Sequence, residues 1–239
     1  MLVSAGTASV IGTAAAGSPG HTSINNNTQH GILVDGTGYV TINQSLTTNV
    51  ATAMGQAYVD LDDNNVAGLW IAQAGATSSQ TNAVSFVEAS GIKTGNGIHV
   101  NGGSFLTLRG SFLVGNHDSG VFVGAGTGAT ADTISGIDLG DTTTDGQNTL
   151  QGPIGSLNNP VAGVCLGIPA PTGTTAGQTL LAVGNTWGVV NVGTVSCEKT
   201  GAGGKLSHAA TCGNGVDLGG VGTTTTGTNT ADISICTYQ

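Results

Sequence analysis

The feature that most constrains this chain is a short motif in which an asparagine precedes a glycine by four residues. The glycine then opens an apolar stretch. The full motif occurs at Asn27–Val34, Asn64–Ile71, Asn116–Val123 and Asn159–Leu166. A fifth copy, Gly97–Val100, keeps the apolar stretch but has Lys93 in place of the asparagine. Self-similarity over tens of residues is typical of repeat architectures, in which similar units stack on one another.

Each unit contains further short apolar stretches. The motif glycines Gly97 and Gly120 are 23 residues apart, and Leu106–Leu108 and Phe112–Val114 lie between them. Similar alternating stretches occur elsewhere at Val40–Ile42, Val84–Phe86 and Ile137–Leu139. Three short strands per unit is the layout of a parallel β-helix, because one unit cannot bury its apolar face alone. We therefore predict an all-β, single-stranded right-handed parallel β-helix (solenoid) with irregular loop insertions.

This prediction assigns 1–239 to a single domain, with repeat coils over about 24–191 and a disulfide-stapled C-terminal end at 192–239. The motif glycines are expected at tight corners with positive φ. The motif asparagines are expected to form a hydrogen-bonded structural ladder from coil to coil, and they are Asn27, Asn64, Asn116 and Asn159. A β-sandwich is the alternative, since it also has short strands between turns, but it does not predict the fixed offset.

Composition excludes several classes of function. The chain has 239 residues, 42 of them glycine, and a formal net charge of −9. Nucleic acid is disfavoured as a partner because phosphates require a lysine and arginine footprint. We predict no membrane span, since no apolar run approaches about eighteen residues. A chain with so few charged residues and so many small polar ones could instead be disordered. The alternation of β-branched with polar residues argues against disorder, because it is typical of β-strands.

The motif units at 27–34, 64–71, 116–123 and 159–166, together with Gly184–Trp187, resemble the right-handed parallel β-helix proteins of the pectate-lyase-like superfold. The resemblance is strongest to secreted bacterial members of unknown function, and it implies an extracellular or cell-surface location. Lyases of that superfold use an arginine or lysine base beside a calcium-bound uronate, and the hydrolases use clustered aspartates. Arg109 is the sole arginine here, and we expect it to point outward with no carboxylate column beside it. We therefore predict no catalytic residue, and enzyme activity stays uncertain.

Strand alternation turns the middle residue of each apolar stretch outward. One outward column is expected to hold Leu33, Trp70, His99, Phe122 and Cys165, and another Thr41, Ser85, Thr107 and Asp138. The candidate binding residues are Leu33, Trp70, His99 and Phe122. Three interpretations remain open for them: the insertions at 72–83, 124–133 and 167–179 cover this face, a partner protein docks on it, or a polysaccharide stacks on its rings.

The four cysteines, Cys165, Cys197, Cys212 and Cys236, are disulfide candidates, and sequence leaves three pairings open. We favour Cys197 with Cys212 and Cys165 with Cys236. A zinc site is disfavoured because no C-x-x-C spacing occurs. Asp60, Asp62 and Asp63 form a weak candidate calcium site, for which a solvated acidic loop is the alternative. His117 and Asp118 resemble an acid–base pair, although a coil corner also accounts for two polar residues.

These patterns favour a non-enzymatic extracellular structural or surface β-solenoid that self-assembles head-to-tail into filaments. Its partners are then other copies of the chain or another surface protein. The alternative is a polysaccharide-binding or polysaccharide-degrading protein. No cofactor is expected beyond the weak calcium candidate.

Overall fold

A computed structural model describes residues 1–12, 21–43, 58–74, 76–127, 134–141, 143–150, 162–166, 182 and 185–186, together with short strands in the C-terminal part. Strands dominate the described residues, and helix is confined there to the 3-10 turn η1 (Ser78–Gln80). The described part of the chain is therefore all-β, as the alternation of apolar residues predicts.

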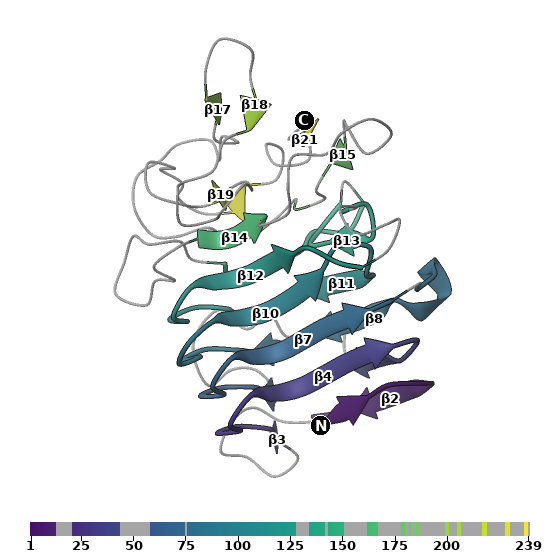
Figure 1. The fold of residues 1–239 in the computed structure, drawn as a ribbon. Coiled ribbons are helices and arrows are strands. Elements are labelled where there is room, and N and C mark those ends of the chain that lie inside the picture. Colours follow the sequence, from purple (N-terminus) through teal and green to yellow (C-terminus); the bar gives the residue numbers. More distant parts are fainter. Residues whose placement is uncertain are drawn as a thin grey trace.

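Most strands belong to three sheets, which we name A, B and C (Figure 1). Sheet A contains, in spatial order, β1 (Leu2–Val3), β4 (His30–Gly36), β7 (Ala67–Gln73), β10 (Asn96–Asn101), β12 (Ser119–Gly124), β14 (Ala162–Leu166) and β19 (Asp217–Leu218). Sheet B contains β2 (Thr7–Val10), β5 (Tyr39–Ile42), β8 (Asn82–Ser85), β11 (Leu106–Arg109) and β13 (Ile137–Asp138). Sheet C contains β3 (Thr22–Ser23), β6 (Val59–Asp60) and β9 (Val87–Glu88).

The strand pairs within A, B and C are parallel, except that β19 pairs antiparallel with β14 at one edge of sheet A. Isolated parallel bridges join Glu88 to Phe112 and Phe112 to Thr149 beyond β9. The remaining strands form antiparallel pairs: β15 (Gln178–Thr179) with β21 (Thr237–Tyr238), β16 (Asn185–Thr186) with β20 (Thr228–Asn229), and β17 (Lys199–Thr200) with β18 (Lys205–Leu206).

The chain passes through sheets A, B and C in the same order several times, and we call one such passage a circuit. The first three circuits begin at β1, β4 and β7. Each sheet strand lies beside the equivalent strand of the next circuit, as Figure 1 shows for β4, β7, β10 and β12 of sheet A. Residues several tens of positions apart in the sequence are thereby brought into contact.

The core lies between the sheets and is built from the inward residues of every strand. Ile32 and Val34 are fully buried, as alternation predicts, and so are Val40 and Ile42 in the next sheet. Each fully buried aliphatic side chain contributes about 1.5–3 kcal/mol of transfer free energy. Together these contributions offset the conformational entropy that is lost when the backbone of the two- to seven-residue strands becomes ordered.

The motif glycines are needed for space, and the expectation of positive φ is wrong for them. Gly31, Gly68, Gly97 and Gly120 are all outside the left-handed region. A Cβ atom on Gly31 would lie 2.7 Å from Asn64 Nδ2 and 2.7 Å from the Gly68 carbonyl oxygen. A Cβ on Gly97 would lie 2.9 Å from Asn116 Nδ2. The motif glycine therefore makes room for an asparagine amide from the corner that precedes the next strand of sheet A.

The motif asparagines bond along the same edge of sheet A. The Asn64 Oδ1 atom accepts hydrogen bonds from Asn27 N at 2.9 Å and from Asn27 Nδ2 at 2.8 Å. The next position in the column is taken by the buried Ile92, whose N donates to Asn116 Oδ1 at 3.3 Å as Asn27 N does to Asn64 Oδ1, whereas Lys93, expected there, is exposed. Asn116 Nδ2 donates to the Ala89 carbonyl of the preceding circuit at 3.0 Å. Asn159 lies outside the described residues.

A second asparagine pair was not anticipated from sequence. Asn148 Nδ2 donates to Asn185 Oδ1 at 2.9 Å, and both side chains are fully buried. Asn148 precedes Thr149 of the sheet C bridge, so this pair lies at the corner between sheets B and C. Asn148 also precedes a glycine, Gly152, by four residues, but Pro153 follows it where the motif has an apolar stretch. The register of the pair depends on loop lengths that sequence does not reveal.

The predicted outward column on sheet B needs one correction. In the structure Thr41 is in register with Ala83, which is in register with Thr107, and Thr107 pairs with Asp138. Ser85 instead pairs with Arg109. Strand β8 begins at Asn82, two residues earlier than the pattern Val84–Phe86 indicated, and Phe86 has left the strand with a φ of 55°.

Candidate functional site

Two groups of side chains are candidates for a functional site. The first, the aromatic column, lies on the outer side of sheet A. The strand register aligns Leu33 with Trp70, Trp70 with His99, His99 with Phe122, and Phe122 with Cys165. The predicted binding residues therefore lie side by side, and all four are half-buried.

The rings of the aromatic column contact one another directly. Trp70 and His99 are stacked, with centroids 4.3 Å apart and an interplanar angle of 9°. His30 meets Trp70 edge-on at 4.6 Å, and Phe122 meets His99 edge-on at 4.9 Å. Trp70 Nε1 also donates to Asn101 Oδ1 at 3.3 Å. One face of the indole is thus occupied by a neighbouring circuit.

The environment of the aromatic column disfavours charge. Burial, followed by the nearby His30, lowers the pKa of His99 to about 4. Burial and the terminal amine likewise lower the pKa of His30. Both imidazoles are neutral at pH 7, which suits a stack of apolar rings.

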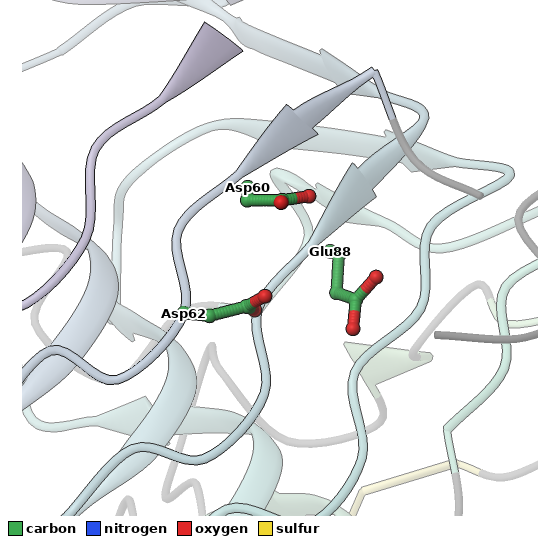
Figure 2. A group of neighbouring side chains, drawn as sticks. All are labelled: Asp60, Asp62 and Glu88. Carbon is green, nitrogen blue, oxygen red and sulfur yellow. The ribbon is translucent and has the colours of Figure 1, made fainter. Parts of the chain in front are cut away.

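The second group, the acidic cluster, consists of Asp60, Asp62 and Glu88 on sheet C (Figure 2). Asp60 of β6 and Glu88 of β9 are register partners, and Asp62 follows β6 by two residues. One carboxylate oxygen from each residue lies within 4.8 Å of the others. Asp63, which we expected here, is exposed with a φ of 53° and is not part of the cluster. Glu88 takes its place.

The acidic cluster brings three carboxyl groups together in a partly buried setting. Burial, followed by the Coulombic effect of Glu88, raises the pKa of Asp62 to about 7. Burial also raises the pKa of Asp60, against the opposing effect of His21, whose Nε2 lies 2.7 Å from Asp60 Oδ2. Asp60 Oδ1 is buried and accepts no hydrogen bond. A cation bound among these carboxylates would offset their mutual repulsion.

A serine hydroxyl connects two members of the acidic cluster. Ser90 Oγ lies 3.0 Å from Asp62 Oδ1 and 3.1 Å from Glu88 Oε1. One hydroxyl carries one proton and donates to only one acceptor at a time. Two ionised carboxylates here therefore repel each other unless a proton or a cation joins them. Glu88 is 1% exposed, so solvent has little access to it.

The other sequence candidates lie apart from both groups. Arg109 does have a carboxylate beside it, contrary to our expectation, because its Nη2 lies 2.7 Å from Asp138 Oδ2 of the next strand. The His117 Nδ1 atom lies 2.8 Å from Asp118 Oδ1, with the two side chains 61% and 39% exposed. Both side chains are therefore open to solvent rather than enclosed in a site.

Cys165 is 1% exposed and disulfide-bonded. Cys197, Cys212 and Cys236 lie outside the described residues, so the pairing stays a prediction.

Comparison of the chain with protein-family models, with curated proteins and with solved structures finds no match. In the part of the chain that the structure describes, no helix is long and apolar enough to cross a membrane.

Proposed function

We propose that sheets A, B and C are the three faces of one single-stranded right-handed parallel β-helix. The repeated order of the sheets and the parallel register between successive circuits support this. Connections between parallel strands of one sheet are right-handed in nearly all proteins, which supports the handedness.

On this architecture the protein serves as a non-enzymatic extracellular or surface scaffold. The observation that supports this proposal is that aromatic, histidine and asparagine side chains, which are often found in active sites, here form contacts between circuits. Trp70 stacks on His99, and Asn27 bonds to Asn64. These contacts supply stiffness along the direction in which circuits stack, as a structural element requires.

Self-association extends the scaffold proposal. Met1, Leu2 and Ile11 on the first circuit are 45%, 63% and 58% exposed, which supports contact with another copy. At the other edge of sheet A, β19 is antiparallel. A strand in that direction does not continue a parallel ladder, so contact between two first circuits is favoured over head-to-tail growth.

Sedimentation velocity over a hundredfold concentration range tests self-association, with Leu2→Lys as the disrupting variant and the exposed Thr28→Lys as the control. A dimer that Leu2→Lys dissociates supports contact at the first circuit. Particles whose size increases steadily with protein concentration support head-to-tail filaments. A monomer at every concentration removes both, and rapid proteolysis of that monomer removes the scaffold proposal itself.

We also propose that the acidic cluster binds calcium and thereby links two circuits. Calcium takes six to eight oxygen ligands, with carboxylates binding through one or both oxygens. Asp60 and Asp62 of one circuit and Glu88 of the next supply carboxylates, and the raised pKa of Asp62 reflects its burial and the nearby Glu88 carboxylate. Bound calcium would stabilise the folded state by mass action.

Thermal unfolding with calcium or with EDTA tests this site. Calcium is expected to raise the Tm of the wild type and of Asp63→Asn, a matched control at the exposed neighbouring aspartate, but not of Asp62→Asn. Equal calcium responses from both variants would place the ion elsewhere, and no response from the wild type would remove the site.

The alternative, polysaccharide binding or degradation through Trp70 and Phe122, has less support. The stacked His99 occupies one face of the indole, and a sugar needs a free ring face. A glycan array decides this alternative: binding lost in Trp70→Ala and Phe122→Ala would establish it, whereas binding that survives both changes would refute that site.

A further inference from the structure

The outer side of sheet B carries a second pair of aromatic residues. Tyr39 and Phe105 each precede a fully buried residue, Val40 and Leu106 respectively, so alternation turns both rings outward. Both are half-buried. Extending the pairings of Thr41 with Ala83 and of Leu106 with Asn82 places Tyr39, Thr81 and Phe105 in one column.

These two rings differ from those of the aromatic column. Among the described residues, the ring pairs are His30–Trp70, Tyr58–Phe86, Trp70–His99 and His99–Phe122, and none includes Tyr39 or Phe105. Phe105 leans over Gly136 of the next circuit, where a Cβ would lie 2.9 Å from its Cδ1 atom. A glycine backbone, and no second ring, therefore lies against this side chain.

The spacing of the two rings suits a chain of sugars. Tyr39 and Phe105 are two strands apart, which corresponds to about 9.6 Å at the usual separation of neighbouring strands. That distance is close to the length of two extended hexose units. The hydroxyl-bearing Thr41 and Thr107 form the adjacent outward column and can hydrogen-bond to sugar hydroxyls.

The charge on this face indicates which polysaccharide it suits. Arg109 and Asp138, its charged pair beside Thr107, neutralise each other at 2.7 Å. The whole chain has a formal charge of −9, which repels polyuronates and other anionic polymers. An uncharged polymer meets no such repulsion.

We propose that the outer face of sheet B binds a neutral, extended polysaccharide that lies along the stacking direction, with Tyr39 and Phe105 as its two ring platforms. This goes beyond the scaffold proposal and needs neither calcium nor self-association. It also places carbohydrate contact on sheet B, away from Trp70 and Phe122.

Co-sedimentation with microcrystalline cellulose and with chitin, and affinity electrophoresis in mixed-linkage β-glucan and in polygalacturonate, test the proposal. We expect the wild type to bind at least one of the neutral polymers and not polygalacturonate. Tyr39→Ala and Phe105→Ala are each expected to weaken binding about tenfold, which is 1.4 kcal/mol. Trp70→Ala is the matched control and is expected to bind as the wild type does.

Two further variants separate binding from folding. Thr41→Lys and Thr107→Lys keep the buried face of the strands intact and place a long charged side chain beside each platform, so both are expected to abolish binding at unchanged Tm. The proposal is overturned if the wild type binds none of the neutral polymers, if the Tyr39, Phe105 and threonine variants bind normally, or if Trp70→Ala causes an equal loss. The scaffold proposal would survive each of these results, because its own test is the oligomeric state together with the resistance of the monomer to proteolysis.

Discussion

Replacing Asp62 with asparagine is expected to stabilise the protein at neutral and alkaline pH when calcium is absent. The substitution keeps the side-chain oxygen that accepts hydrogen bonds from Ser90 N and Ser90 Oγ. It removes the carboxylate that Glu88 and Asp60 repel. An amide nitrogen close to those two carboxylates can also donate to them.

The magnitude follows from the raised pKa of Asp62. A carboxyl with a pKa of about 7 in the folded state and 3.8 in the unfolded state binds its proton more tightly when folded. The contribution of Asp62 to folding stability is therefore greatest below pH 3.8 and is lost as pH rises toward 7 and above. One pKa unit corresponds to about 1.4 kcal/mol, so the difference between the folded and unfolded pKa values of Asp62 corresponds to about 4 kcal/mol of stability. Solvent reaches this half-buried side chain and reduces that free energy. We therefore expect Asp62→Asn to raise the free energy of unfolding by about 2 kcal/mol at pH 8.

Urea unfolding of the wild type, Asp62→Asn and Asp63→Asn at several values between pH 4 and pH 8, all in EDTA, measures this gain. The gain should be largest at pH 8 and should nearly vanish at pH 4, because the wild-type carboxyl is then protonated as well. Asp63→Asn should show little change at either pH. The reasoning is refuted if Asp62→Asn is less stable than the wild type at pH 8, or if its gain is the same at both ends of the range.

Three further predictions concern the contacts between circuits. Gly31→Ala should lower the free energy of unfolding by about 1–3 kcal/mol in urea denaturation, because its Cβ would meet the Gly68 carbonyl at 2.7 Å; an unchanged midpoint would contradict the space argument. Asn64→Ala should cost about 2 kcal/mol in the same assay, since the buried Asn64 amide bonds to both Asn27 and Leu61, and a loss below 0.5 kcal/mol would contradict its role. For His99, whose folded pKa of about 4 lies below 6.5, stability should fall as pH drops from 6.5 to 4, by up to about 3 kcal/mol. His99→Phe should remove that part of the pH dependence, and identical wild-type and variant profiles would contradict it.

Much of sheet A could be predicted from the sequence because the motif marks each of its middle strands. An asparagine, a glycine and an alternating apolar stretch together fix where the strand begins and which residues face inward, as the burial of Ile32 and Val34 shows. The reason assigned to the glycine was wrong. Its need for space depends on an asparagine many residues later in the chain, which only the stacked structure brings close.

Sheet C could not be predicted for a related reason, and neither could the place of Glu88 in the acidic cluster, although Asp60 and Asp62 were expected there. Strands β6 and β9 have two residues each, too few to show a period, and they carry no motif. Asp62 and Glu88 approach each other only because of the register between these strands, and that register depends on loops of different lengths. Ser85 was misplaced on sheet B for the same reason, since a strand shifted by two residues keeps the same alternation.

The spacing of the motif glycines in sheet A also indicates how such a chain tolerates insertions and deletions. Gly97 and Gly120 are 23 residues apart and Gly120 and Gly163 are 43 apart, yet Phe122 is in register with His99 on one side and with Cys165 on the other. Alignment is thus re-established at each pass through sheet A, whatever length of loop precedes it. Insertions and deletions between passes can therefore accumulate during evolution without shifting the rows of side chains that later passes present.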